Sequence, residues 1–324
     1  MLKLLRIIIP GGNGQVGTVL SRHFHSQGHE VVILARKPAA APWRVVSWDG
    51  EHLGDWTSEL ENSDVVINLA GRSVNCRYTE ANRKAIMDSR TETTRLLGRA
   101  IGQLAHPPRL WMNASTATIY RHIYDRPMDE QGEIGGNERE APAKWKFSID
   151  VATGWEAAFF DAVTPNTRKV ALRSAMIMSP DPGGIFDTLL RLVRFGLGGT
   201  AGSGQQFISW IHETDFASAL EFLIARAELE GCVNIASPNP LPHREFMKAL
   251  RQVWGTWIGR PATTWMLEIG TFFLRTETEL VLKSRRVIPG RLADAGFQFQ
   301  FPDWTSAARD LVARWRAGQH TAVY

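Results

Sequence analysis

The chain has 324 residues, of which 44% are hydrophobic and 22% charged, and its formal net charge at pH 7 is +4. This composition is typical of a soluble globular protein with one large domain or two modest ones. The basic residues are scattered, so nothing indicates nucleic-acid binding, and no apolar run approaches the ~18–20 residues that span a bilayer. Only Cys76 and Cys232 are cysteines, which favours a reducing compartment, and we expect a cytoplasmic protein without a membrane partner.

The first predicted strand, residues 4–9, runs directly into a glycine-rich turn. Residues 10–17 read Pro-Gly-Gly-Asn-Gly-Gln-Val-Gly, so that Gly11, Gly14 and Gly17 have the spacing G-x-x-G-x-x-G. The first glycine allows a tight turn, the second allows close approach of a pyrophosphate, and the third lets the following helix pack on its strand. An amphipathic stretch follows, and its first amides would face an anion. The predicted phosphate loop comprises Gly11, Gly12, Asn13, Gly14, Gln15 and Val16; an ordinary strand–helix turn is the alternative.

The second predicted strand, residues 30–34, indicates which dinucleotide is bound. An acidic residue near the end of this strand binds the ribose hydroxyls in NAD-preferring sites. Here the strand is followed by Ala35, Arg36 and Lys37, with no carboxylate. A guanidinium and an ammonium would instead bind a 2′-phosphate, which favours NADP(H) over NAD(H). Alternatively, these are solvated charges at a strand end, above all Lys37.

Further short apolar runs alternate with amphipathic stretches along the next hundred and forty residues. We predict strands at 43–48, 64–69, 109–114 and 170–173, and helices at about 80–105 and 148–163. This alternation predicts an α/β fold with a doubly wound parallel sheet, in which ligands bind at the carboxyl ends of the strands. Residues 121–146 are polar and rich in Gly, Pro and Glu, which indicates a long loop.

Beyond residue 180 the pattern changes. The glycine-dense segment 196–204 is either a flexible cover for the ligand or a simple connection between domains. A helix at about 213–228, a short strand at 232–235 and a helix at about 242–254 follow, and the last seventy residues are predicted to be mainly helical. We therefore expect a dinucleotide-binding domain at 1–180, to which segments of about 205–237 return, and a C-terminal substrate or cap region at 181–324.

Several motifs together resemble the extended short-chain dehydrogenases/reductases of the nucleotide-sugar epimerase/dehydratase type. They are Asn-Leu-Ala-Gly at 68–71, Ser-Arg-Thr-Glu-Thr-Thr at 89–94, Ser-Thr-Ala-Thr-Ile-Tyr at 115–120, Leu-Arg at 172–173, Ser-Trp-Ile-His-Glu-Thr-Asp at 209–215 and Asn-Ile-Ala-Ser-Pro at 234–238. More narrowly, segments 89–90 and 209–212 are similar to the "epimerase family protein" subgroup. That subgroup has a C-terminal domain of unassigned function, which residues 245–311 resemble. The resemblance implies a Rossmann-like domain with a smaller, mainly helical C-terminal domain.

The usual catalytic pair of the family is absent. In relatives a Tyr-x-x-x-Lys pair transfers the proton, because the lysine stabilises the tyrosinate. None of the four tyrosines here is followed by a lysine four residues later, and the corresponding helix has Ser148 and Ala152 at the two positions. The resemblance places Thr116 where it would orient a substrate oxygen. Tyr120 is the other candidate catalytic residue, with a packing role as its alternative. Lys144 and Lys146, just ahead of that helix, could replace the missing lysine, but solvent-exposed loop lysines are the simpler interpretation.

The resemblance also implies further cofactor contacts. Asp49 would bind the adenine amino group or cap a turn, and Arg90 would hold a ribose or a phosphate. Leu69, Ala70 and Gly71 would pass along the central ribose of the cofactor, and Ser115 would lie near the nicotinamide ribose. No Cys, His or Asp spacing indicates a metal site. We expect an NADP(H)-binding oxidoreductase or epimerase-like protein that acts on an unidentified small carbonyl or hydroxyl compound, as a monomer or homodimer. The alternative is a non-catalytic NADP(H) sensor.

Overall fold

A seven-stranded sheet forms the centre of the computed structural model, which describes residues 4–138, 142, 145–261 and 282–318. The strand order is β10-β6-β5-β4-β1-β2-β3, and every neighbouring pair is parallel. The strands are β1 (Arg6–Pro10), β2 (Glu30–Ala35), β3 (Arg44–Ser47), β4 (Val65–Asn68), β5 (Leu110–Thr116), β6 (Arg168–Ser174) and β10 (Gly231–Ile235). The order reverses between β1 and β4, where a doubly wound sheet binds ligands. The predicted fold class is confirmed.

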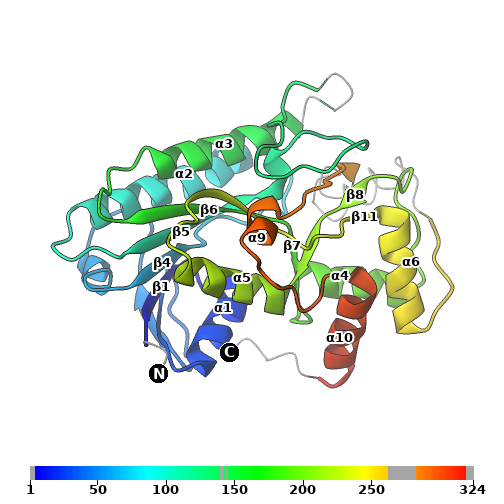
Figure 1. The fold of residues 1–324 in the computed structure, drawn as a ribbon, viewed down its shortest axis with the longest axis horizontal. Helices are drawn as coiled ribbons and strands as arrows, with labels where there is room; N and C mark the ends of the chain where they lie inside the picture. The colour runs from blue at the N-terminus through cyan, green and yellow to red at the C-terminus, as the bar shows by residue number, and fades with distance from the viewer. Residues whose placement is uncertain (1–3, 139–141, 143–144, 262–281, 319–324) are drawn as a thin grey trace.

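Helices cover both faces of this sheet (Figure 1). On one face lie α2 (Glu80–Gly102) and α3 (Lys146–Phe160), and on the other lie α1 (Gln15–Ser26) and α5 (Glu213–Ala225). Successive side chains of a strand point to opposite faces, so Ile7 and Ile9 pack in the α1/α5 core while Ile8 packs in the α2/α3 core. Because both faces are covered, the inner strands β1, β2 and β4 have continuous apolar runs rather than alternating ones, whereas the edge strand β3 is only partly buried.

A second, smaller group of elements adjoins the carboxyl end of the sheet (Figure 1). Strand β7 (Met176–Met178) pairs in parallel with β9 (Trp210–His212), and β8 (Phe207–Ile208) pairs with β11 (Leu241–Pro242). Around them lie α4 (Ile185–Arg194), α6 (His243–Trp254) and α10 (Trp304–Arg316), whereas α9 (Gly290–Asp294) packs against β10. The 3-10 turns η1 (Asp55–Glu59) and η2 (Ala117–Ile119) lie elsewhere. The core of this group contains Trp210 and Trp304, both fully buried.

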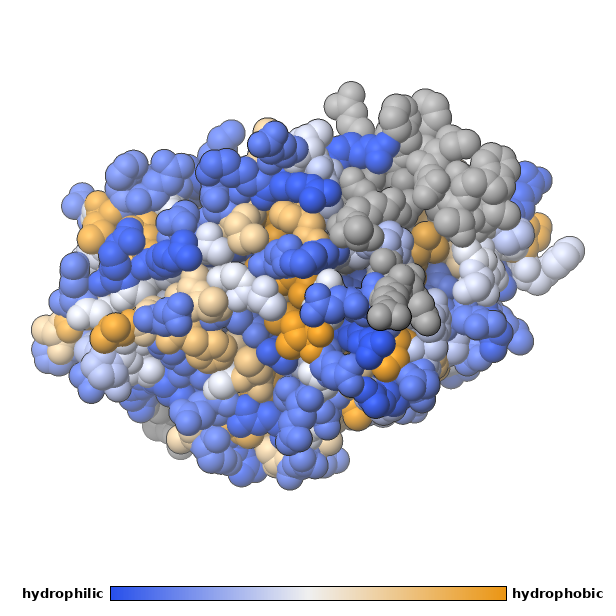
Figure 2. Space-filling model, turned by 90° about the horizontal axis from the view of Figure 1, so that it is seen from above, coloured by the Kyte–Doolittle hydropathy of each residue, from blue (hydrophilic) through white to orange (hydrophobic). Residues whose placement is uncertain are grey.

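The predicted large elements agree with the observed ones to within a few residues, whereas the short ones differ. Strands β7, β8, β9 and β11 were not expected from the sequence, because segments of two or three residues carry no periodicity. Helix α4, which has ten residues, was not expected either. Of the predicted helical C-terminus, residues 262–281 and 319–324 lie outside the described residues. Within the described residues no helix combines the length and apolarity needed to cross a bilayer. The face shown in Figure 2 is mostly hydrophilic, with apolar residues in small groups.

Candidate functional site

The three glycines of the turn between β1 and α1 have different surroundings. Gly11 has φ = +75°, and a Cβ there would lie 2.7 Å from the backbone nitrogen of Ala70. A Cβ on Gly17 would lie 2.2 Å from the carbonyl oxygen of Gly12, which is far inside contact distance. A Cβ on Gly14 would have no neighbour nearer than 3.9 Å, the carbonyl oxygen of Gly11. The chain itself therefore requires glycine at 11 and 17, whereas at 14 it leaves an open approach to the backbone.

The start of α1 presents hydrogen-bond donors that the protein does not use. Among the described residues, the backbone amides of Asn13 and Gly14 donate to no acceptor, and both residues are exposed. The side-chain nitrogen Nε2 of Gln15 is buried and likewise has no partner there. The first turn of α1 contains no acidic residue, so the positive end of its dipole is not neutralised locally. This donor set fits an anion such as a pyrophosphate.

The end of β2 is held beside this turn. The side chain of Asn13 donates to the carbonyl oxygen of Lys37 at 3.0 Å, and the amide of Gly11 donates to Leu34. Arg36 and Lys37 are exposed at this edge. Asp49, beyond β3, caps a turn by accepting from the amides of Glu51 and His52, and these hydrogen bonds lower its pKa to about 2. Its turn-capping role is therefore observed, and its contact with adenine stays a prediction.

A buried hydrogen-bond network fixes the loop that carries Leu69, Ala70 and Gly71. The Asn68 side chain accepts from the amide of Ala70 at 3.0 Å and donates to the side chain of Asn113 at 2.7 Å. Because the loop after β4 packs directly on Gly11, the network also fixes the position of the glycine turn. The predicted contacts at 11–16 and 69–71 are thus side by side, at the ends of the adjacent strands β1 and β4.

Arg90 lies beneath Gly71 on α2. Its Nη1 donates to the carbonyl oxygens of Arg72 and Ile86, and its guanidinium lies 5.1 Å from the ring of Trp155. Burial lowers the pKa of Arg90 to about 10, and no carboxylate pairs with it among the described residues. An additional anionic partner would stabilise such a buried cation, which favours the predicted role, and the contact of Arg90 with a cofactor ribose or phosphate stays a prediction.

A second buried network joins β5, α3, β6 and β10 through charged groups. Glu156 of α3 accepts from Ser115 at 2.6 Å and from Arg173 through two hydrogen bonds of 2.8 Å. Arg173 also donates to the hydroxyl of Tyr120 at 3.0 Å, and that hydroxyl donates to Asn234 at 2.7 Å. The hydroxyl of Ser115 therefore points to Glu156, and its contact with the nicotinamide ribose stays a prediction.

Tyr120 occupies a buried position. Only 2% of the residue is exposed, its hydroxyl has both a donor and an acceptor, and burial raises its pKa to about 12. A phenol in this environment is a poor proton donor or acceptor near neutral pH. Its catalytic role stays a prediction, and this geometry favours the packing alternative.

Thr116 ends β5 and caps the 3-10 turn η2. Its Oγ1 accepts from the amide of Thr118 at 3.1 Å. Because the oxygen accepts this bond, the hydroxyl proton is directed elsewhere, and among the described residues it donates to no acceptor.

On the neighbouring helix α3, Ala152 is fully buried and Lys146 forms an ion pair with Asp150. No described lysine therefore lies at the family's usual catalytic position on α3.

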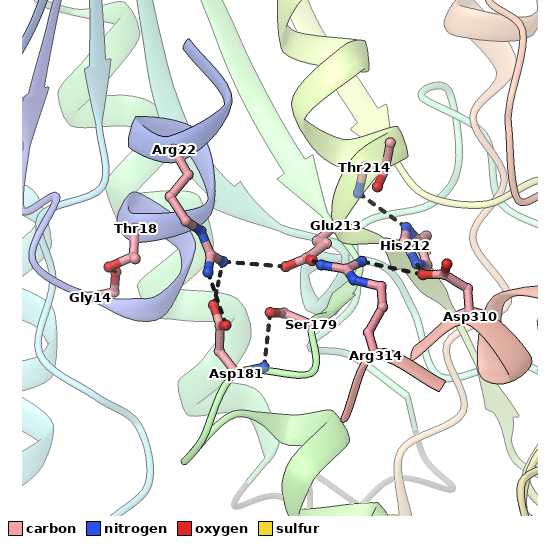
Figure 3. Close-up of polar contacts among 10 residues, drawn as sticks. All are labelled: Gly14, Thr18, Arg22, Ser179, Asp181, His212, Glu213, Thr214, Asp310 and Arg314. Carbon is pink, nitrogen blue, oxygen red and sulfur yellow. Dashed lines mark hydrogen bonds and ion pairs between the residues drawn. The ribbon is translucent and has the colours of Figure 1, made fainter. Parts of the chain in front are cut away.

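The segment after β7 also belongs to this site, and the sequence analysis missed it. A Cβ on Gly184 would overlap the Gln15 side chain, and Arg22 of α1 forms two hydrogen bonds with Asp181. These contacts of Asp181 and Gly184 place residues 179–184 against α1. The guanidinium of Arg22 also lies 3.8 Å from the carboxylate of Glu213, toward which it points in Figure 3. The only sequence signal was the break Asp-Pro-Gly-Gly at 181–184, which predicts a turn but not its neighbours.

The same charged contacts continue to α10 (Figure 3). Glu213 forms an ion pair with Arg314, which also donates a hydrogen bond of 3.2 Å to Asp310. Asp310 in turn is hydrogen-bonded to Nε2 of His212 at 3.0 Å. Nδ1 of His212 accepts from the amide of Thr214, so Nε2 carries the proton and donates to Asp310. His212 is fully buried and caps α5, which is a structural role.

A parallel, doubly wound sheet with a glycine turn at its switch point defines a Rossmann-type protein. Residues 7–236 match the model of the NAD dependent epimerase/dehydratase family, and residues 262–311 match a domain of unknown function, DUF1731. The chain belongs to this epimerase/dehydratase family, which confirms the resemblance seen in the sequence, including the C-terminal domain of unassigned function.

Individual relatives agree with this assignment. The chain is 33% identical to mouse "Epimerase family protein SDR39U1", over 95% of this chain and 100% of the relative. It is 30% identical to the "Epimerase family protein SH2119" of Staphylococcus haemolyticus, over 95% and 99% of the two chains. The crystal structure of human SDR39U1 (isoform 2) with NADPH superimposes with a TM-score of 0.83 at 29% identity, covering 95% of this chain and 99% of that chain.

Proposed function

We propose that this protein binds NADP(H) and acts as an oxidoreductase or epimerase-like enzyme on a small carbonyl or hydroxyl compound. The observation that carries the proposal is the start of α1, where free amides, the unpartnered Gln15 side chain and the open face of Gly14 together fit a pyrophosphate. The human relative that was crystallised with NADPH supports the same cofactor.

Preference for the phosphorylated cofactor rests on the end of β2. Arg36 and Lys37 are exposed beside the glycine turn, and neither has an ion pair among the described residues. A guanidinium bonded to a phosphate gains two charge-assisted hydrogen bonds, whereas NADH offers it only hydroxyls. The proposed cofactor contacts are Gly11, Gly12, Asn13, Gly14, Gln15, Val16, Arg36, Lys37, Asp49, Leu69, Ala70, Gly71, Arg90 and Ser115.

The proposed chemistry centres on Thr116. A bound nicotinamide supplies or accepts a hydride, which suits both oxidoreduction and epimerisation through transient oxidation. The Thr116 hydroxyl, with its oxygen fixed by the amide of Thr118, donates a hydrogen bond to the substrate oxygen. The chain lacks the Tyr-x-x-x-Lys pair, so this hydrogen bond acts without an adjacent tyrosinate.

A non-catalytic NADP(H) sensor is the second candidate function. Two observations favour it: the hydroxyl of Tyr120 is buried, and Ser148 and Ala152 leave the two positions of the family's usual proton-transfer pair without a tyrosine or a lysine. In either case we propose a cytoplasmic protein that is monomeric or homodimeric.

Calorimetric titration with NADPH, NADH and their oxidised forms tests the cofactor. The expected result is saturable binding with NADPH preferred at least tenfold, whereas equal affinity for NADH would contradict the assignment of Arg36. A second assay follows the absorbance of NADPH with a panel of carbonyl compounds (an ortho-quinone, an α-diketone, aldehydes). Turnover of one of them supports the enzyme, and tight binding without any turnover supports the sensor.

A further inference from the structure

Residues 283–288, which lie within the matched domain of unknown function, run between the loop that follows β5 and the short strand β8. On one side the amide of Ser284 donates to Nδ1 of His122 at 2.8 Å, and its hydroxyl donates to the carbonyl of Ile123 at 2.7 Å. On the other side the amide of Arg285 donates to the carbonyl of Phe207 at 2.9 Å. The segment is therefore hydrogen-bonded to the loop that follows the candidate catalytic strand β5.

Two cations of this segment converge on one residue of η2. Nζ of Lys283 donates to the carbonyl oxygen of Thr118 at 2.8 Å, and Nε of Arg285 donates to its side-chain oxygen at 3.0 Å. The amide of the same Thr118 donates to Oγ1 of Thr116. All three hydrogen-bonding groups of Thr118 are thus used, and they link the two cations to the Thr116 hydroxyl.

The burial of Lys283 makes this arrangement unusual. Only 2% of the residue is exposed, and it lines a small cavity together with Glu138, Trp145 and Ile149. Burying an ammonium is costly unless it is paired and hydrogen-bonded, and here Lys283 donates to the Thr118 carbonyl and faces the carboxyl of Glu138. Burial alone would raise the pKa of Glu138, but hydrogen bonds from backbone amides and the charge of Lys283 lower it. An apolar side chain would still fill this space at lower cost if packing were the whole role of Lys283. Lys146 borders the same cavity, but it is exposed and pairs with Asp150.

We propose that Lys283 and Arg285 are positioning residues, which hold Thr118 so that the Thr116 hydroxyl points at the substrate oxygen. This inference rests on the proposed function, because Lys283 can affect the reaction through Thr116 only if Thr116 binds the substrate oxygen. The matched domain of unknown function thereby completes the active site: it sets the direction of a hydrogen-bond donor that belongs to the Rossmann-type domain.

The experiment compares Lys283→Met, which keeps the apolar stem, with Lys283→Arg, which can still donate to a carbonyl. Lys146→Met is the matched control, since it removes an ammonium from the same cavity without touching Thr118. Each variant is measured for NADPH affinity, for amide hydrogen exchange of the peptide that contains η2, and for kcat and KM with the carbonyl compound that the wild-type protein turns over.

We expect Lys283→Met to lower kcat about tenfold and to raise exchange at η2 about tenfold, because a hydrogen bond to a charged donor is lost. NADPH affinity should stay within about twofold, as none of these residues contacts the glycine turn. Lys283→Arg should restore most of kcat, and Lys146→Met should resemble the wild-type protein. In a Thr116→Ala background, Lys283→Met should lower kcat no further, because it acts through Thr116.

Two results would overturn the inference. The first is unchanged exchange at η2 and unchanged kcat in Lys283→Met. The second is an equal loss of kcat from Lys283→Met with or without the Thr116 hydroxyl, which would mean that it acts by another route. If the wild-type protein turns over no carbonyl compound, the proposed function fails instead, while the exchange measurement still reports whether Lys283 holds η2.

Discussion

Replacing two glycines of the same turn by alanine should have opposite consequences, which separates the cofactor site from the fold. At Gly14 the backbone is extended (φ −81°, ψ 171°), and an added Cβ would have no neighbour within 3.9 Å. Alanine adopts this conformation without strain and restricts the unfolded chain. Because Gly14 is also the N-cap of α1, where alanine is a poorer residue than glycine, the two effects oppose each other, and Gly14→Ala should change the free energy of unfolding by less than about 1 kcal/mol.

The same Cβ would stand where the pyrophosphate has to approach the start of α1. We expect Gly14→Ala to weaken NADPH binding at least tenfold, which corresponds to about 1.4 kcal/mol or more. At Gly17 the Cβ would lie 2.2 Å from the carbonyl oxygen of Gly12, and the next nearest atoms are also backbone of Gly12, which cannot move aside as a flexible side chain would. Overpacking of this kind costs about 1–3 kcal/mol, so Gly17→Ala should lose stability.

Urea unfolding followed by fluorescence gives the stability of each variant, and calorimetric titration gives its NADPH affinity. Stability is measured without the cofactor, because a ligand that binds only the folded state would add its own contribution. The reasoning fails if Gly14→Ala binds NADPH as tightly as the wild-type protein. It would fail equally if Gly14→Ala were as unstable as Gly17→Ala.

Three further predictions concern charge. Arg36→Ala should weaken NADPH binding about tenfold or more and leave NADH binding unchanged, and an equal loss for both cofactors in calorimetry would refute a contact with the 2′-phosphate. Burial lowers the pKa of His243 to about 4, below its usual 6.5, so its stabilising effect is complete above pH 6.5. About 3 kcal/mol should be lost as the pH falls from 6.5 to 4, and His243→Gln should abolish this dependence in urea unfolding. Glu156→Gln should cost about 3–5 kcal/mol by leaving Arg173 buried and unpaired, whereas Glu92→Gln, in an exposed pair, should cost less than about 0.5 kcal/mol.

The parallel sheet was predictable because both of its faces are buried. The inner strands β1, β2 and β4 are then mostly apolar runs between turn signals, and the glycine turn marks where the first one ends. The short strands β7 and β9 were not predictable, since three residues in a strand depend on a partner that is distant in the chain.

Within the site, sequence spacing located the residues whose role depends on backbone geometry. Gly11, Gly14 and Gly17 follow from local rules, because a tight turn, an open approach and a close packing each exclude a side chain. The role of Tyr120 did not follow in this way. Its partners Arg173 and Asn234 come from β6 and β10, and only the folded sheet shows that they bury its hydroxyl.

The sequence by itself thus determined the α/β class, the phosphate turn and the basic end of β2, all of which depend on neighbouring residues and on strand periodicity. The tertiary structure alone decided that residues 179–184 lie against α1 and that Lys283 reaches Thr118. The residues in these contacts are more than a hundred and fifty positions apart in the chain. No local pattern encodes such a contact, because it forms only when the smaller group of elements packs against the central sheet. This packing brings the loops at the carboxyl end of the sheet together.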